Sequence, residues 1–172
     1  MHTILTDTER TPVEGRVDLL VYCNVLMTFT SNSTDETKTI GYRLGNLLKP
    51  GSVVGLYGEL GSGKTVFVKG IARAFGIRER DIMSASFTIV TQYDTMPQFN
   101  HIDLYRIEKE SELEELGLWD YIGEGSVSVI EWAEKVEQEL PDDAIRVRFR
   151  PIEDNIREIT IEGDNEEYRN NM

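Results

Sequence analysis

The chain of 172 residues has little cysteine, little basic charge and no long hydrophobic run. Its single cysteine, Cys23, excludes an internal disulfide framework and any metal site built from several cysteines. The longest apolar segments, such as 53–57, are far shorter than the roughly 20 residues that cross a bilayer. Lys and Arg number 18 against 31 Asp and Glu, for a net charge of −13. A surface that follows a phosphate backbone needs clustered basic residues, so we expect a partner to hold any nucleic acid.

The two ends of the chain differ from its middle. Residues 1–26 lack a sustained helical or strand period and predict an N-terminal extension outside the core; a wrongly assigned start codon, with Met27 as the true initiator, would look the same. Acidic residues before the apolar stretch 17–27 disfavour a secretory signal, and we expect a cytoplasmic protein. Residues 27–163 predict one domain, and the charged residues 164–172 a frayed acidic tail.

Between these ends, strands alternate with helices. A capping box, Ser33 with Glu36, predicts the start of the first helix, with the Glu36 side chain reaching back to the cap amide; Pro50-Gly51 follows its end. Further helices are predicted at about 64–75, 108–117 and 133–140, and strands at 27–31, 52–57, 87–93, 99–105, 127–130, 146–150 and 156–161. This order predicts an α/β fold, with a largely parallel central sheet flanked by helices and antiparallel additions near the C-terminus.

One strong motif, Gly58-x4-Gly63-Lys64-Thr65, follows a predicted strand and opens a predicted helix. The glycines permit a loop whose main-chain N–H groups surround phosphate oxygens, and the helix N-terminus adds partial positive charge. We expect Lys64 to reach the β- and γ-phosphates and the Thr65 hydroxyl to bind Mg²⁺. The motif predicts a P-loop NTPase-like domain that binds nucleotide through Gly58, Glu59, Leu60, Gly61, Ser62, Gly63, Lys64 and Thr65.

A second acid, at the end of another strand, is needed to complete such a metal site. Asp103 and Glu131 both end apolar segments, and the carboxyl ends of parallel strands line the ligand crevice. For both Asp103 and Glu131, the alternative interpretation is a solvated acid on the surface of an acidic protein. His101 is expected to orient a neighbour on its strand, because one histidine with one carboxylate is too few for zinc. Trp132 fits stacking on a base or partner, and equally a place in the core or rim.

Six segments together resemble the TsaE (YjeE) family, small bacterial ATPases of tRNA threonylcarbamoyladenosine (t6A) synthesis. In the family's order they are Thr37-x3-Gly41, 58–65, 84–90, His101-Ile-Asp-Leu-Tyr-Arg106, 114–121 and Val129-Ile-Glu-Trp132. The P-loop alone is shared by many families, whereas its combination with the His-x-Asp-Leu-Tyr-Arg and Ile-Glu-Trp segments is specific.

By position, the resemblance implies that residues 58–65 bind ATP and that Thr65 binds Mg²⁺. Glu131 matches the glutamate that completes the metal site, and Asp103 matches the aspartate near the metal and the γ-phosphate. The expected catalytic residues are therefore Lys64, Asp103 and Glu131, and the expected metal ligands are Thr65, Glu131 and Asp103.

The resemblance also implies contacts from other segments. Ser86 and Thr88 fall in a segment likened to a switch, Thr34 matches a position near the adenine, and Arg157 matches one near the nucleotide from the C-terminal hairpin. The chain departs from the family at Ala85 and Ser86, where Pro and then Thr are usual. Ser86 keeps a hydroxyl, so a polar contact there survives.

The activity implied is slow ATP hydrolysis with Mg²⁺, in partnership with the TsaB–TsaD heterodimer. TsaD transfers a threonylcarbamoyl group to adenosine 37 of tRNAs that read ANN codons, and ATP turnover would reset the complex between cycles. The resemblance implies tRNA contact only through the partner, no membrane association, and a monomer or weak dimer alone.

Two other functions remain open. A small-molecule or nucleoside kinase needs an arginine-rich lid over the phosphates, whereas residues 108–115 are rich in Glu. A nucleotide-gated binding module, in which hydrolysis is incidental, has no sequence feature that separates it from an ATPase. A GTPase is disfavoured because the chain has no Asn-Lys-x-Asp stretch. We expect Arg106 to pair with the Glu-rich stretch rather than to act on the γ-phosphate.

Overall fold

The computed structural model describes residues 25–83, 88–123, 125–163 and 172, and the statements below concern that part of the chain. Its strands are β1 (Val25–Ser31), β2 (Val53–Tyr57), β3 (Val90–Tyr93), β4 (Gln98–Asp103), β5 (Ser126–Glu131), β6 (Ile145–Glu153) and β7 (Ile156–Gly163). Its α-helices are α1 (Thr34–Gly45), α2 (Lys64–Ala74) and α3 (Glu110–Leu116), and its 3-10 turns are η1 (Glu79–Asp81), η2 (Leu118–Tyr121) and η3 (Ala133–Val136).

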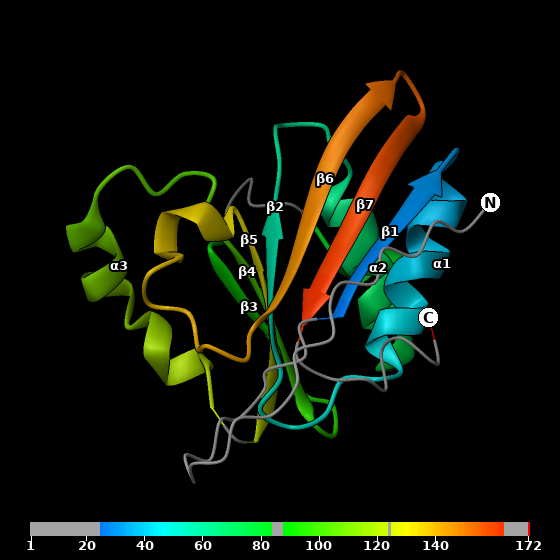
Figure 1. Ribbon diagram of the computed structural model, residues 1–172. Coiled ribbons are helices and arrows are strands. Elements are labelled where there is room, and N and C mark those ends of the chain that lie inside the picture. Colours follow the sequence, from blue (N-terminus) through cyan, green and yellow to red (C-terminus); the bar gives the residue numbers. More distant parts are fainter. Residues whose placement is uncertain (1–24, 84–87, 124, 164–171) are drawn as a thin grey trace, which may run out of the picture.

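The strands form one sheet in the order β1-β7-β6-β2-β5-β4-β3 (Figure 1). The four central strands, β6, β2, β5 and β4, run parallel. At the edges, β3 pairs antiparallel with β4, and β7 pairs antiparallel with both β6 and β1. The predicted α/β class, with its parallel centre and antiparallel C-terminal strands, is confirmed.

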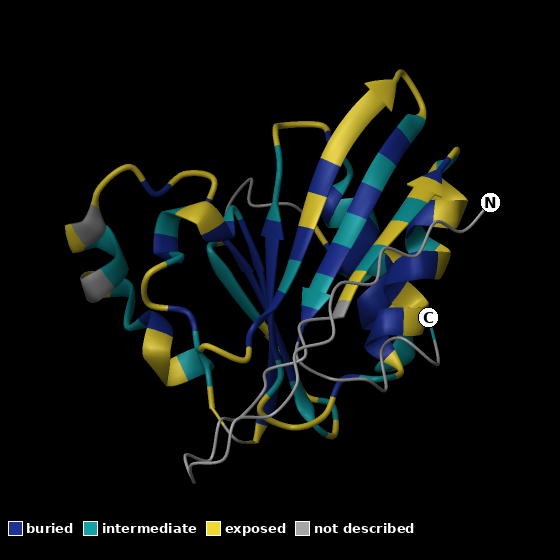
Figure 2. Ribbon diagram, viewed as in Figure 1, coloured by how far each residue is buried: buried dark blue, intermediate teal, exposed yellow. Residues whose placement is uncertain are grey.

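Helices cover both faces of the parallel centre. Val54 and Leu56 of β2 pack in the core cluster shared with α1 and α2, whereas Val53 packs in a second cluster with residues that follow β4 and β5. Every residue of β5 is buried, as the dark central strands of Figure 2 show. Burial on both faces explains why β2 reads as a nearly continuous apolar run instead of an alternating one.

The helices α1 and α2 touch backbone to backbone. A Cβ atom on Gly41 of α1 would collide with the Phe67 carbonyl oxygen, and one on Gly70 of α2 would collide with the Lys38 carbonyl oxygen. Only glycine allows this approach. The contact fixes α2, and hence the loop that precedes it, against the rest of the core.

Several elements begin or end a few residues from their expected bounds, and three differences bear on packing or capping. The first strand begins at Val25 instead of Met27, because Val25 and Leu26 pair with Gly163 and Glu162 of β7. The Ser33 hydroxyl caps α1 by accepting from the Glu36 N–H at 3.1 Å, as expected. The Glu36 carboxylate, however, accepts from the Asn32 N–H at 2.7 Å and not from the cap residue's own amide.

The third difference is the predicted helix 133–140, which is wrong. Only the four-residue 3-10 turn η3 forms there, after Trp132 with its positive φ of 61°. The Lys135 ammonium in this turn donates to the Leu104, Tyr105 and Ile107 carbonyl oxygens, at 2.9, 2.8 and 2.6 Å. These bonds tie η3 to the segment that follows β4.

Most of the predicted extension and tail, including Cys23, lies outside the described residues. Within the described part, no helix combines the length and the hydrophobicity that crossing a membrane requires.

Candidate nucleotide-binding site

A cavity of about 390 Å³ opens at the carboxyl ends of β4 and β5, beside the loop that joins β2 to α2. It is lined by Leu60, Gly61, Gly63, Lys64, Thr65, Val66, Asp103, Tyr105, Arg106, Glu131 and Trp132. Asp103 and Glu131 lie opposite each other in the parallel register of β4 and β5. They are 4% and 2% exposed, so neither is a solvated surface acid. Asp103 and Glu131 thus lie at the cavity, as expected for residues at the carboxyl ends of parallel strands.

The loop has the backbone that its glycines predict. Gly58 and Gly63 adopt φ angles of +145° and +107°, which L side chains rarely adopt. A Cβ on Gly58 would lie 2.9 Å from the Phe149 carbonyl oxygen, so the loop also approaches β6 closely. No side chain caps the start of α2 at Gly63. The N–H groups of this first turn can therefore serve an anion in the cavity.

Lys64 lies in the wall of the cavity and is almost fully buried. Its ammonium donates to the Gly58 and Glu59 carbonyl oxygens at 2.6 and 2.9 Å and lies 3.9 Å from the centre of a Trp132 ring. Burial lowers the pKa of Lys64, and the charges of Glu131, Glu134 and Asp103 oppose that shift. Trp132 is partly exposed and contacts Tyr105, with ring centres 5.1 Å apart. It belongs to the rim of the cavity.

Glu131 is held at both carboxylate oxygens. Its Oε2 accepts from the Thr65 hydroxyl at 2.9 Å, and its Oε1 lies 2.9 Å from His101 Nε2. His101 on β4 therefore contacts Glu131 on the adjacent strand, and not the expected neighbour on its own strand. Sequence spacing gave no signal for this contact, because it depends on the register of β4 against β5.

Thr65 and Glu131 offer a magnesium ion two adjacent hard oxygen groups, with Asp103 beside them in register. The Asp103 Oδ1 atom also accepts from the Tyr105 N–H at 3.1 Å. Among the described residues, no group of three or more His, Cys, Asp or Glu side chains is placed to hold a metal ion. Mg²⁺ does not need such a group, because proteins usually bind it through one or two carboxylates together with substrate phosphates and water.

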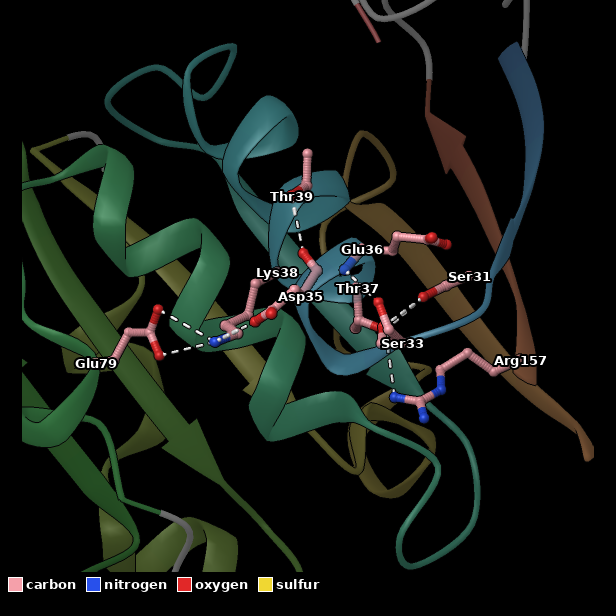
Figure 3. A network of polar contacts seen from close by, with 9 residues as sticks. All are labelled: Ser31, Ser33, Asp35, Glu36, Thr37, Lys38, Thr39, Glu79 and Arg157. Atoms are coloured by element: carbon pink, nitrogen blue, oxygen red, sulfur yellow. Dashed lines mark hydrogen bonds and ion pairs between the residues drawn. The ribbon is translucent and has the colours of Figure 1, made fainter. Parts of the chain in front are cut away.

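Arg157 reaches the P-loop from the C-terminal hairpin. It follows the inward phase of β7 with Ile159 and Ile161, and it is 8% exposed. Its Nη1 atom lies 2.7 Å from the place that a Cβ of Gly63 would occupy. Its partner in the described part is a neutral hydroxyl, Thr37 Oγ1, at 3.2 Å (Figure 3). A buried guanidinium with a neutral partner beside a P-loop suits an anion.

Thr37 itself is fixed by β1 and the helix start. Its hydroxyl lies 2.8 Å from Ser31 Oγ and donates to the Ser33 carbonyl oxygen at 3.1 Å (Figure 3). In the Thr37-x3-Gly41 motif, Thr37 thus bonds Arg157, and Gly41 permits the close contact between α1 and α2. Thr34, the predicted adenine-side residue, is exposed at the first position of α1, one turn before Thr37.

The remaining predicted residues are less clearly joined to this cavity. Ser86 and Ala85 lie outside the described residues. Thr88 is exposed and lines a second cavity, of about 890 Å³, which Thr65 also lines. Arg106, expected to turn to the Glu-rich stretch, lines the first cavity instead, as do Leu60 and Tyr105. Tyr105 and Arg106 belong to the His-x-Asp-Leu-Tyr-Arg segment, so the sequence contained a signal for them.

The parallel sheet, with its phosphate-type loop between β2 and α2, defines a P-loop NTPase-like protein. Comparison with known proteins narrows this class. The family model described as "Threonylcarbamoyl adenosine biosynthesis protein TsaE" matches residues 31–159. The chain belongs to the TsaE family.

Individual relatives agree with this membership. The chain is 41% identical over 128 residues to the "tRNA threonylcarbamoyladenosine biosynthesis protein TsaE" of Bacillus subtilis, covering 74% of this chain and 79% of that protein. The protein of the same name from Treponema pallidum is 38% identical over 135 residues, with 78% and 99% coverage. The crystal structure of Bacillus subtilis YdiB is similar with a TM-score of 0.67 and 32% identity, covering 85% of this chain and 90% of that one.

Proposed function

We propose that this protein is a Mg²⁺-dependent, cytoplasmic ATP-binding protein and slow ATPase that serves the t6A modification of adenosine 37 in tRNAs reading ANN codons. The names of its relatives support the pathway. The observation that carries the ATPase proposal is the Thr65–Glu131 pair, in which a P-loop hydroxyl meets a buried strand-end carboxylate at 2.9 Å.

We assign each residue of the site a role that follows from its chemical groups. The N–H groups of the loop and of the first turn of α2 bind the phosphates. Lys64 exchanges its carbonyl partners for β- and γ-phosphate oxygens, and Arg157 adds a second cation beside Gly63. Thr65 and Glu131 hold Mg²⁺, with Asp103 in support. When bound, that ion neutralises charge on the transferring phosphoryl group.

Partner dependence follows from what the cavity offers. The described residues supply Lys64 and Arg106 in its lining and Arg157 beside Gly63, together with two buried carboxylates. P-loop proteins of this kind are slow until a stimulating group, often an arginine from a partner, completes the site. We assign that role to a TsaB–TsaD complex, which would also hold the tRNA, because this chain carries a net charge of −13.

The test is an ATPase assay with the protein alone, with TsaB–TsaD from the same organism, and with tRNA but no partner. We expect weak hydrolysis alone, marked stimulation by the partner and no effect of tRNA. Full-rate hydrolysis alone, or stimulation by tRNA, contradicts the partner-dependent proposal. Single-turnover hydrolysis that stays absent with the partner, while nucleotide still changes docking, identifies a nucleotide-gated binding module instead.

A further inference from the structure

We propose that His101 is a positioning residue that fixes the orientation of the Glu131 carboxylate, and so determines how well the site binds its divalent cation. This inference rests on the proposed function, because it assigns His101 a role in the Mg²⁺ site. It starts from a chain of contacts that crosses three elements, from β4 through β5 to α2: His101 Nε2 to Glu131 Oε1 at 2.9 Å, and Glu131 Oε2 to Thr65 Oγ1 at 2.9 Å.

The contact between His101 and Glu131 matters because both side chains are buried. The side chains of His101 and Glu131 are each 3% exposed, so water is a poor substitute for either partner. An ionised carboxylate oxygen only accepts hydrogen bonds, so His101 bonds an ionised Glu131 by donating from Nε2. Removing that donor would leave Oε1 buried without a partner, which is costly for a charged group.

The contact also makes the two carboxylate oxygens different. In isolation a carboxylate can rotate and present either oxygen, but here Oε1 is tied to β4 and Oε2 is left on the Thr65 side. A ligand oxygen held in this way needs no reorientation when a cation binds. Outer partners that orient metal ligands typically contribute about 10–100-fold to metal affinity.

Two substitutions of His101 distinguish the loss of the hydrogen-bond donor from the loss of side-chain packing. His101→Gln keeps an N–H donor at about the reach of Nε2, whereas His101→Leu has similar bulk and no donor. His101→Asn is polar but too short to reach Glu131 Oε1. It replaces His101→Leu in the comparison if the leucine variant does not fold. Ser128→Ala is the matched control, since Ser128 is buried in the same strand as Glu131 and bonds the Tyr121 carbonyl oxygen instead.

The measurement is the affinity for Mn²⁺ in the presence of ADP, determined from the electron paramagnetic resonance signal of Mn²⁺. The affinity for ADP in EDTA and the melting temperature are measured in parallel. We expect His101→Leu to weaken Mn²⁺ binding by at least about tenfold, with His101→Gln and Ser128→Ala close to the wild type. Affinity for ADP without metal should stay near the wild-type value in all variants.

Three results would overturn the inference. One is unchanged Mn²⁺ affinity in the variant that lacks the donor. Another is a glutamine variant as weak as the leucine or asparagine variant, since that would assign the effect to packing of the ring. A third is loss of metal-free ADP affinity in step with Mn²⁺ affinity, which would indicate general damage to the cavity. Wild-type protein in which ADP adds nothing to Mn²⁺ binding would instead overturn the proposed function, and this inference with it.

Discussion

The parallel centre of the sheet and its antiparallel C-terminal side use charged residues differently. In β4 and β5 the acids Asp103 and Glu131 are buried at the strand ends. In the hairpin, Glu158 and Glu162 are partly exposed on the outer face and pair with Arg150 and Arg148 at 2.9 and 3.1 Å. Exposed pairs of this kind contribute about 0–1 kcal/mol to stability. The difference indicates that burial, and not the number of charges, distinguishes the acids at the candidate site from those on the surface.

Arg157 tests that rule, because it is the hairpin arginine that lies inside. It shares the inward phase of β7 with isoleucines and reaches Gly63, whereas Arg148 and Arg150 point outward to glutamates. If the rule holds, substitutions at buried charges should change nucleotide chemistry, and substitutions at exposed charges should not.

The largest effect is expected from Lys64→Ala. Hydrolysis with the partner should fall by at least about tenfold, because charge on the transferring phosphoryl group is no longer neutralised. The melting temperature should be retained, since this side chain binds its own loop and not the apolar core. Unchanged hydrolysis by folded Lys64→Ala protein would mean that the cavity is not the reaction site.

The two buried acids should differ from each other. Glu131→Gln removes a charge that contacts the Thr65 hydroxyl, whereas Asp103→Asn changes a side chain that also accepts from the Tyr105 N–H. We expect the Mg²⁺ concentration for half-maximal hydrolysis to rise more in Glu131→Gln, since hard divalent cations favour anionic oxygen. Equal shifts in a Mg²⁺ titration would contradict the distinction between the two acids, and reversed shifts would exchange their roles.

Arg157→Ala should weaken ATP binding by roughly tenfold, the size of one lost charge-assisted hydrogen bond. Arg150→Ala is the control, because it removes an equal charge from the same hairpin at an exposed position. Calorimetric titration with ATP compares the two. Equal losses would show that the hairpin acts through its overall charge and not through the buried guanidinium.

The smallest effect is expected at the N-terminus. A shortened protein that begins at Val25 keeps the whole of β1 and should melt within a few degrees of the full chain. A start at Met27 removes the pairs of Val25 and Leu26 with β7 and should melt slightly lower. A large drop for the Val25 start would show that the preceding residues pack on the domain.

Local patterns predicted much of this molecule. Apolar runs and period-two alternation located the strands, and the glycine spacing located the loop between β2 and α2. The positions of Asp103 and Glu131 at strand ends indicated that both face the cavity. The contact between His101 and Glu131 was not predicted, because it requires the register of two strands that pair across the sheet. The helix predicted at 133–140 was wrong, and local periodicity gave no sign of the positive φ of Trp132 or of the long-range Lys135 bonds that accompany the 3-10 turn found there.

The glycine contact between α1 and α2 has a consequence for any mutational survey of this protein. Adding one methyl group at Gly70 would press on the Lys38 carbonyl oxygen, and one at Gly41 would press on the Phe67 carbonyl oxygen. Backbone cannot yield as a side-chain tip does, so the helices would have to separate. Because α2 starts at Lys64, the separation would re-aim the phosphate loop. A screen for lost nucleotide affinity would therefore select these two glycines together with true ligand contacts, although neither lines the cavity described here.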